Sequence, residues 1–452
     1  MLTYLHSTGH CVNRPEDYNL LNVGTENLSP AGDGRVSSMA QSLVGSEILK
    51  IASDILTMVA QGKRICNLTV GDFSPKEFRI PKFLEEQINE AYLSGETNYP
   101  PADGIPALKK SVMSFYAQQL ELDYPLDAVL ITGGSRPGIY ATYSALVDPG
   151  DTVVYPVPSW NNNHYCHLVR ALGMPVACRK DVSFLPTREL LRHSVRGARL
   201  LALNSPLNPT GTAFAREELE KICDLVLEEN SRRSSSERPL YVMYDQVYWM
   251  LTFGSTTHVN PVSVRPEMRP YTIFVDGISK SFAATGVRVG WVVGPPDIVK
   301  KMASIIAHVG AWAPRAEQVA TAKLLNATDE IARYHKEMKA GVQARLDALY
   351  VGISALRKGG FPVDAITPMG AIYLSTRFAL EGKRTTNGTP LRTNEDIRKY
   401  LLHEAGLAVV PFQAFGTTED DGWFRLSVGS VSLDEINSML PKLRGALGAL
   451  SN

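Results

Sequence analysis

With 452 residues, the chain is long enough for two domains. Its 46 lysines and arginines balance 46 aspartates and glutamates, so we expect a small-molecule partner rather than nucleic acid or an anionic membrane. Five scattered cysteines without a CxxC pair argue against a disulfide framework or a zinc site and favour a reducing compartment. The sequence shows no signal-peptide pattern and no apolar run of membrane length, so we expect a soluble, cytoplasmic protein.

The N-terminal half predicts an arm, a helix and then alternating strands and helices. Residues 1–35 are rich in Asn, Gly, Ser and Pro and predict an arm of uncertain order. A helix follows, capped by Ser46 and ended by Gly62, and its apolar face consists of Ile48, Ile51, Ile55 and Val59. Apolar runs then alternate with helical stretches, which predicts a mainly parallel sheet covered by helices. The predicted strands are residues 128–131, 152–155, 199–203, 240–244, 272–275 and 287–293.

The C-terminal part begins with a charged, periodic stretch from Glu317 to Leu356 that predicts one long or kinked helix leading into a second domain. Shorter strand signals return at residues 371–375, 407–410 and 423–428. Between these halves, residues 230–236 are rich in Ser and Arg and predict a flexible surface insertion. A regulatory site is an alternative interpretation of that insertion, and a solvated loop is the simpler one.

Lys280 is the most informative residue. It follows Ser279 just beyond a predicted strand, and Arg288 stands eight residues further on between two glycines. Burial beside cationic groups turns an ammonium into a nucleophilic amine, which can form a Schiff base with an aldehyde. A solvated surface lysine would have the same local sequence, so the other motifs must decide.

Residues 132–138 predict an anion site. They follow a strand and open a helical stretch, where Gly134 lets backbone amides approach an anion and Ser135 adds a hydroxyl donor. The segment lacks the GxxxxGK[ST] and GxGxxG patterns of nucleotide binding. A plain strand-to-helix turn is the alternative.

Three further side chains end predicted strands. Trp160 could stack on a planar ring, Asn208 could direct its amide at a ring oxygen, and Asp245 is a carboxylate that needs a cationic partner such as a protonated ring nitrogen. A core tryptophan, an Asn-Pro turn and a helix cap are the respective alternatives. Open α/β sheets bind ligands at the carboxyl ends of their strands, so these groups should meet. Together they match what a pyridoxal phosphate enzyme requires of its protein.

From residues 67–72 (NLTVGD) to residues 423–429 (WFRLSVG), the chain resembles class I/II aminotransferases of the fold-type I pyridoxal phosphate superfamily, in particular aspartate aminotransferases. The resemblance implies an α/β fold with a mainly parallel seven-stranded sheet sandwiched by helices, plus a smaller α+β domain. The implied parts are an arm (1–35), the N-terminal part of the small domain (36–75), the large cofactor domain (76–325) and the C-terminal small domain (326–452).

The resemblance also implies roles for single residues. Lys280 would carry the cofactor and act as general base, Asp245 would hold the ring nitrogen, and Tyr248 would contact the ring hydroxyl. Tyr99 would reach the phosphate of the neighbouring subunit, which implies a homodimer with shared active sites. The implied cofactor-binding residues are Gly134, Ser135, Arg136, Trp160, Asn208, Asp245, Tyr248, Ser279, Lys280, Arg288 and Tyr99. The implied substrate-binding residues are Gly71, Trp160, Asn208, Arg136 and Arg425, with Arg425 on the α-carboxylate.

Two departures from the family pattern bear on function. Gly277 stands where many relatives have a phosphate-binding serine, and Ser135 stands where some aspartate-specific relatives have a lysine. Arg136 is our candidate for recognition of a distal carboxylate, because a guanidinium binds a carboxylate with two hydrogen bonds; an exposed arginine at a helix start is the alternative. We therefore predict transamination between aspartate and 2-oxoglutarate with ping-pong kinetics.

Four other functions stay open on the sequence alone. The substrate could be an aromatic or aliphatic amino acid, and the same cofactor could support a lyase or a cyclising synthase. A non-catalytic ligand-sensing regulator and a phosphate or nucleotide binder are the remaining alternatives, although residues 1–35 are too short and too weakly basic for a DNA-binding module.

Overall fold

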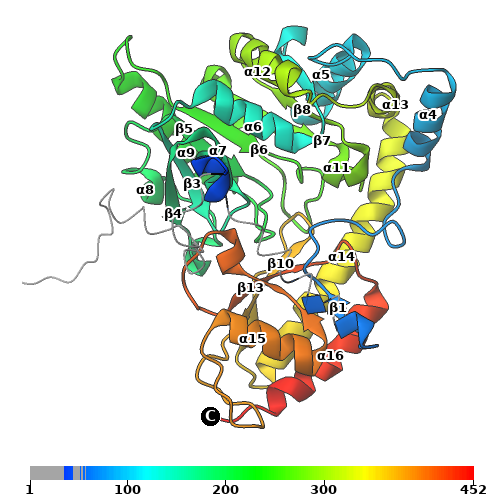
Figure 1. The fold of residues 1–452 in the computed structure, drawn as a ribbon, viewed down its shortest axis with the longest axis vertical. Helices are drawn as coiled ribbons and strands as arrows, with labels where there is room; N and C mark the ends of the chain where they lie inside the picture. Colours follow the sequence, from blue (N-terminus) through cyan, green and yellow to red (C-terminus); the bar gives the residue numbers. More distant parts are fainter. Residues whose placement is uncertain (1–34, 44–50, 52–53, 56–57) are drawn as a thin grey trace, which may run out of the picture. The chain divides into compact units, whose positions relative to one another are not determined.

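The computed structural model describes residues 35–43, 51, 54–55 and 58–452, and the chain forms two compact units, Met1–Val44 and Gly45–Asn452 (Figure 1). In the first unit, the described residues contain the short helix α2 (Ser38–Gln41), whose cap Ser37 accepts a hydrogen bond from the Ala40 amide at 3.2 Å. The predicted arm lies outside the described residues, apart from Arg35. The predicted domain boundaries stay predictions. Among the described residues, no helix is long and apolar enough to span a membrane.

A seven-stranded sheet forms the centre of the second unit and confirms the predicted α/β fold. Its four successive pairs from β7 to β4 are parallel, whereas β8 runs antiparallel to both of its neighbours. In spatial order the strands are β2 (Val129–Thr132), β8 (Gly290–Val293), β7 (Thr272–Gly277), β6 (Tyr241–Asp245), β5 (Leu200–Asn204), β3 (Thr152–Val157) and β4 (Leu172–Ala177). The sequence did not predict β4, because its Gly-Met-Pro core weakens the strand pattern; an edge strand tolerates such a proline.

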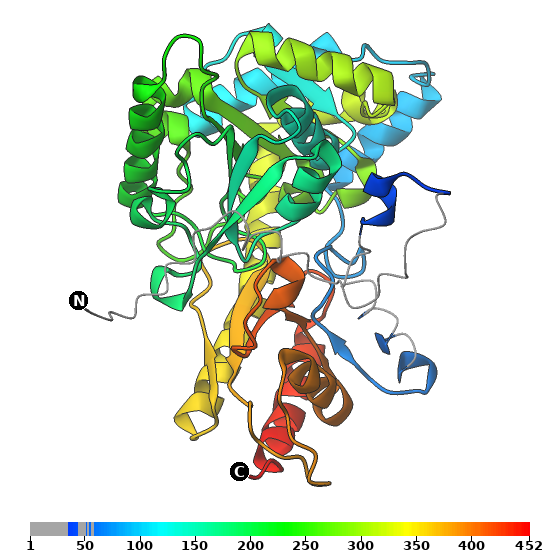
Figure 2. The same cartoon turned by 60° about the vertical axis from the view of Figure 1, so that its left-hand side comes forward.

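Helices bury both faces of this sheet, as Figures 1 and 2 show. Along β2, Leu130 joins the apolar cluster beneath one helical layer, whereas Val129 and Ile131 join the cluster on the opposite face. This explains why the strands read as nearly continuous apolar runs. One layer comprises α6 (Ser135–Leu146), α7 (Asn162–Val169) and α12 (Pro296–Val309). The other comprises α5 (Pro106–Leu120), α9 (Arg216–Arg232) and α13 (Arg315–Leu325), with α4 (Lys82–Leu93) packed on α13. Shorter helices are α8 (Arg188–Leu191), α10 (Pro261–Val264) and α11 (Ile278–Ser281).

A smaller sheet lies beside the long helix α14 (Thr328–Lys358), drawn in yellow in Figure 1. This antiparallel sheet has the order β12 (Val410–Pro411), β13 (Trp423–Ser427), β10 (Tyr373–Phe378) and β9 (Val363–Ala365). Helices α15 (Asn394–Tyr400) and α16 (Leu433–Gly448) complete this region. The early strand β1 (Cys66–Asn67) pairs in parallel with the late strand β11 (Leu407–Ala408), so the chain segment before the large sheet joins the C-terminal part.

Three sequence predictions need correction. The helix predicted from Glu317 to Leu356 is two helices, because the chain leaves α13 at Asn326 and restarts at Thr328. The strand predicted from residue 287 begins only at Gly290, since Arg288 has a left-handed backbone with φ 61°. The insertion at 230–236 is partly ordered: α9 extends to Arg232, and the buried Arg233 pairs with Glu229 at 2.9 Å.

The helix predicted between Ser46 and Gly62 is partly described. Residues 51, 54–55 and 58–60 are helical, and Ile51 and Ile55 are buried as expected. Val59, predicted on the apolar face, is exposed, and the neighbouring Met58 is buried in its place. Ser46 and Ile48 lie outside the described residues.

Candidate active site

The amine of Lys280 lies where the large sheet meets the segment that carries Gly71. Lys280 is on α11, immediately after β7, and its Nζ donates a hydrogen bond to the Gly71 carbonyl at 2.6 Å. Burial lowers the pKa of Lys280 to about 8; nearby Asp72 opposes this, and Arg425, Arg136 and Arg288 add to it. The structure therefore gathers three predicted arginines around the predicted nucleophile.

Asp245 ends β6 and lacks a cationic hydrogen-bond partner in the described chain. Its carboxylate accepts the Val247 amide at 3.2 Å, and burial raises its pKa to about 6 despite the nearby Lys280. It lines a small cavity of about 20 Å³ together with Trp160, Tyr165 and other side chains. This cavity, with room for about one water molecule, places a carboxylate and an aromatic ring on the same lining.

The predicted anion site forms where α6 begins. Gly134 has φ 89°, and a Cβ there would stand 2.3 Å from Nη2 of Arg288, so only glycine lets the guanidinium lie over the turn. Arg288 donates to the Gly133 carbonyl at 2.9 Å. An anion here would meet backbone amides at the turn and at the N-terminus of α6, a 12-residue helix that begins at Ser135. The guanidinium of Arg288 would add positive charge.

A side chain at Gly277, such as the serine of the family pattern, would be crowded by strand β8. A Cβ at this position would lie 2.8 Å from the Gly290 Cα and 2.9 Å from the Val289 carbonyl oxygen. Strands β7 and β8 therefore approach too closely for a side chain here. This packing explains why position 277 is a glycine and offers no hydroxyl. The nearest predicted hydroxyl in the sequence is that of Ser279, which is buried on α11.

Arg425 is a buried cation without a carboxylate partner among the described residues. Only 1 % of its surface is exposed, and its guanidinium donates to the Asn208 side-chain oxygen at 3.2 Å and the Thr69 carbonyl at 2.6 Å. Its Nε has no hydrogen-bond partner in the described chain. The rings of Tyr373 and Phe415 each lie 4.8 Å from its Cζ. A buried guanidinium without a carboxylate partner among the described residues is costly, so an anion bound beside it would stabilise it.

Tyr248 has a neighbour that sequence reasoning missed. Its hydroxyl lies 2.5 Å from the hydroxyl of Tyr373, and both side chains are buried. Tyr373, Phe415 and Asp72 join the predicted site. Asp72 ends the NLTVGD segment but was given no role, and Tyr373 and Phe415 belong to no motif. Tyr373 lies in a predicted strand, where an aromatic residue is expected in the core, and Phe415 lies outside every predicted element, so only the tertiary contacts reveal these two residues.

Arg136 and Trp160 form a separate part of the site. The Arg136 Cζ lies 5.2 Å above the Trp160 ring, and within the described residues Arg136 forms no ion pair. Its side chain is exposed at the beginning of α6. A guanidinium over an indole that lines the Asp245 cavity, with no ion-pair partner among the described residues, can bind a second anionic group.

Tyr99 differs from the other predicted site residues. It is 82 % exposed, and its ring lies edge-on to Trp312 at a centroid distance of 5.6 Å. Such a large exposed aromatic side chain is available to another molecule.

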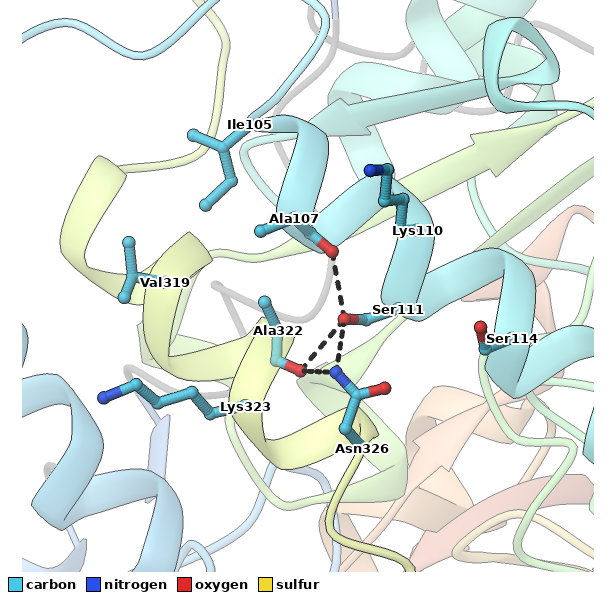
Figure 3. A pocket seen from close by; sticks show the side chains of 9 residues that line it. All are labelled: Ile105, Ala107, Lys110, Ser111, Ser114, Val319, Ala322, Lys323 and Asn326. Carbon is cyan, nitrogen blue, oxygen red and sulfur yellow. Dashed lines mark hydrogen bonds between the residues drawn. The ribbon is translucent and has the colours of Figure 1, made fainter.

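A larger cavity of about 430 Å³ lies between α5 and α13, away from these residues (Figure 3). Two of its polar side chains are already paired: the Ser111 hydroxyl lies 3.0 Å from both the Ala107 and the Ala322 carbonyl oxygens, and the Asn326 amide donates to Ser111 at 2.8 Å. None of the predicted site residues lines this cavity, so we assign the chemistry to the Lys280 site.

The fold brings an amine, a carboxylate and the predicted anion site to the carboxyl edge of an α/β sheet. Residues 63–443 match the model of the family described as aminotransferase class I and II. The chain belongs to this family and is an aminotransferase. It is 29 % identical to an aspartate aminotransferase of Rhizobium meliloti over 92 % of this chain and 97 % of that protein.

Two solved structures share the fold. The aspartate aminotransferase from Rhizobium meliloti has a TM-score of 0.84 at 28 % identity, covering 92 % of this chain and 100 % of that one. The aspartate aminotransferase from Thermus thermophilus with maleate has a TM-score of 0.78 at 26 % identity, covering 91 % and 99 %. These relatives favour an aminotransferase over a lyase, a regulator or a nucleotide binder.

Proposed function

We propose that this aminotransferase uses pyridoxal 5'-phosphate and acts on a dicarboxylic amino acid, with aspartate as donor and 2-oxoglutarate as acceptor. One observation carries the substrate class: Arg425 and Arg136 are two guanidinium groups without carboxylate partners in the described chain, and both act on the charge of Lys280. A substrate with two carboxylates would satisfy both. The relative from Thermus thermophilus was solved with maleate, a dicarboxylate, which supports the same class.

The residues present fit a phosphorylated pyridine aldehyde. Asp245 is a carboxylate whose pKa burial raises, which suits a protonated ring nitrogen as its partner, and the indole of Trp160, which lines the same small cavity, suits a planar ring. The Gly134 turn and Arg288 suit a phosphate, and Ser135 and Ser279 add hydroxyls nearby. When bound, pyridoxal phosphate supplies the electron sink for the charge that develops at the substrate Cα.

Lys280 would form the covalent link and then move the proton at the substrate Cα. With a pKa of about 8, roughly a tenth of the lysine is neutral at pH 7, against about 0.03 % for a lysine at 10.5. Burial thus supplies about 300-fold more of the reactive form at this pH. Asp245 would keep the ring nitrogen protonated, and Tyr248 would donate to the ring oxygen.

Arg425 would orient the substrate by its α-carboxylate. Asn208 accepts one guanidinium N–H, and the backbone at Gly71 closes the site from the other side, with its carbonyl on Lys280. Fixing the carboxylate fixes the direction of the Cα–H bond, which is the positioning contribution to catalysis. Arg136 would hold the distal carboxylate, with Trp160 keeping the guanidinium plane in place.

We further propose a cytoplasmic homodimer with shared active sites. The exposed Tyr99 beside Trp312 suits a contact with the phosphate of the neighbouring subunit. The cysteines of the described chain are free and buried, which suits a reducing compartment: Cys66, Cys166, Cys178 and Cys223. Molar-mass measurement by light scattering tests the dimer.

An amino-donor panel on wild type and Arg136→Ala tests the substrate assignment. We expect kcat/KM for aspartate to fall about 10- to 100-fold, since a charge-assisted hydrogen bond contributes about 1.5–3 kcal/mol, while alanine turnover stays unchanged. Arg79→Ala, which removes an exposed arginine paired with Glu85, is the matched control and should alter neither substrate. Equal losses for aspartate and alanine would rule out distal-carboxylate recognition by Arg136.

A further inference from the structure

Tyr373 lies between two functional groups of the proposed site. It begins β10, and its ring lies 4.8 Å from the Cζ of Arg425, while Phe415 covers the same guanidinium at 4.8 Å. Its hydroxyl lies 2.5 Å from that of Tyr248. A Cβ built on Gly71 would lie 3.0 Å from the Tyr373 hydroxyl oxygen, so that oxygen packs directly against the segment that accepts the Lys280 hydrogen bond.

We propose that Tyr373 is a positioning residue that couples the carboxylate-binding arginine, Arg425, to the hydroxyl of Tyr248. This inference rests on the proposed function. Through its ring, Tyr373 holds the guanidinium plane. Through its hydroxyl, it holds Tyr248 in the orientation that directs the Tyr248 proton to the cofactor.

The ring contact matters because Arg425 is bound by few hydrogen bonds. Its Nε forms no hydrogen bond in the described chain, and its guanidinium donates two others. Packing against the guanidinium must therefore limit its rotation. The register of the small sheet pairs Tyr373 with Ser427 and Ser375 with Arg425, which places Tyr373 and Arg425 on diagonal positions of neighbouring strands. The backbone register therefore sets the stacking geometry before any substrate arrives.

The hydroxyl contact matters because a phenol has a single proton to donate. If Tyr373 donates to Tyr248, the Tyr248 proton is free for the cofactor oxygen, and the chain of two hydrogen bonds strengthens the second donor. The titratable groups around the pair are Asp245, Asp72 and Arg425, with the Lys280 amine 6.0 Å from the Tyr248 ring centroid. With pyridoxal phosphate bound, a weaker Tyr248 donor would leave more negative charge on the cofactor's ring oxygen and would raise the pKa of the bound chromophore.

The experiment compares Tyr373→Phe, Tyr373→Leu and Tyr400→Phe as holoenzymes. Tyr400 is the matched control because its buried hydroxyl also makes one hydrogen bond, to the Ala446 carbonyl at 2.7 Å, outside the site. Each variant is titrated by absorbance of the bound cofactor, assayed for KM and kcat with aspartate, and unfolded thermally as apoprotein.

For Tyr373→Phe we expect the chromophore pKa to rise by about half to one unit, the effect of one hydrogen bond, with KM within about twofold of wild type. For Tyr373→Leu we expect the same rise and, because the stacking is lost, a KM for aspartate about tenfold higher. Tyr400→Phe should lower the unfolding temperature of the apoprotein without changing either quantity.

An unchanged chromophore pKa in Tyr373→Phe, or a KM in Tyr373→Leu no higher than in Tyr400→Phe, would overturn the proposal and leave Tyr373 a core residue. Failure of the proposed function itself would look different, because wild-type protein would then bind no pyridoxal phosphate and show no chromophore to titrate.

Discussion

Asp245 should destabilise the apoprotein at neutral pH, so Asp245→Asn should stabilise it. Burial raises the pKa of Asp245 from 3.8 to about 6, which corresponds to about 3 kcal/mol at 1.36 kcal/mol per unit. Asp245 is only half-buried, so solvent screening reduces this figure, and we expect about 1–2 kcal/mol. An asparagine oxygen can still accept the Val247 amide, so the substitution removes the charge and keeps the local hydrogen bond.

The raised pKa of Asp245 also predicts how its effect on stability changes with pH. A carboxyl with a raised pKa in the folded state binds its proton more tightly there, so its contribution to stability is full below pH 3.8 and is lost as the pH rises through about 6. The gain of Asp245→Asn should therefore be complete at pH 8 and roughly half as large at pH 5.

Urea unfolding of the two apoproteins at pH 5, 6.5 and 8 measures this difference. Asp224→Asn is the control, because that carboxylate pairs with Arg265 at 2.7 Å and its loss should bring no gain at pH 8. In the holoenzyme, Asp245→Asn should lower transamination by about 100-fold or more, since the ring nitrogen loses its anionic partner. A gain in stability that does not depend on pH, or a loss at pH 8, would refute the assignment of an uncompensated carboxylate.

Three further predictions concern other parts of the site. Lys280→Ala should remain folded by circular dichroism yet lose transamination, because the lysine acts chemically; near-normal turnover would remove the mechanism. Arg425→Gln should raise KM for aspartate and alanine alike, by about 10- to 100-fold in steady-state assays, because both substrates carry the α-carboxylate. Gly277→Ser should destabilise the protein by about 1–3 kcal/mol in urea unfolding, because its Cβ would lie 2.8 Å from Gly290, whereas Gly286→Ser, with nothing within 4 Å, should not.

The central sheet was predictable because its strands are buried on both faces. Such strands read as uninterrupted apolar runs, and all six predicted runs correspond to strands within a few residues at their ends, with the largest error at the start of β8. The two features missed have local causes. Strand β4 contains glycine and proline, and the break between α13 and α14 at Asn326–Ala327 has neither, so no punctuation in the sequence marks it.

The site was partly predictable for a different reason. Lys280, Asp245 and Asn208 each follow a predicted strand, and parallel strands bring their carboxyl ends to one edge, so sequence position alone implies proximity. Tyr373 and Phe415 have no such link. Their role depends on packing against Arg425 from other segments of the small-sheet region, and an aromatic residue in an apolar run carries no sign of that contact.

The site holds its charges before its ligands are bound, and this has a thermodynamic consequence. Among the described residues, Asp245 has no cationic hydrogen-bond partner and Arg425 no carboxylate partner, and burial disfavours the charged forms of Asp245, Arg425 and Lys280. Each lowers the stability of the apoprotein, and each is compensated by a specific part of the proposed cofactor or substrate. A ligand with charges in matching places removes this loss of stability when it binds, and a ligand without them does not. A ligand that lacks one matching charge leaves that residue uncompensated, so the same groups that lower the stability of the apoprotein give the site selectivity for an anionic amino acid.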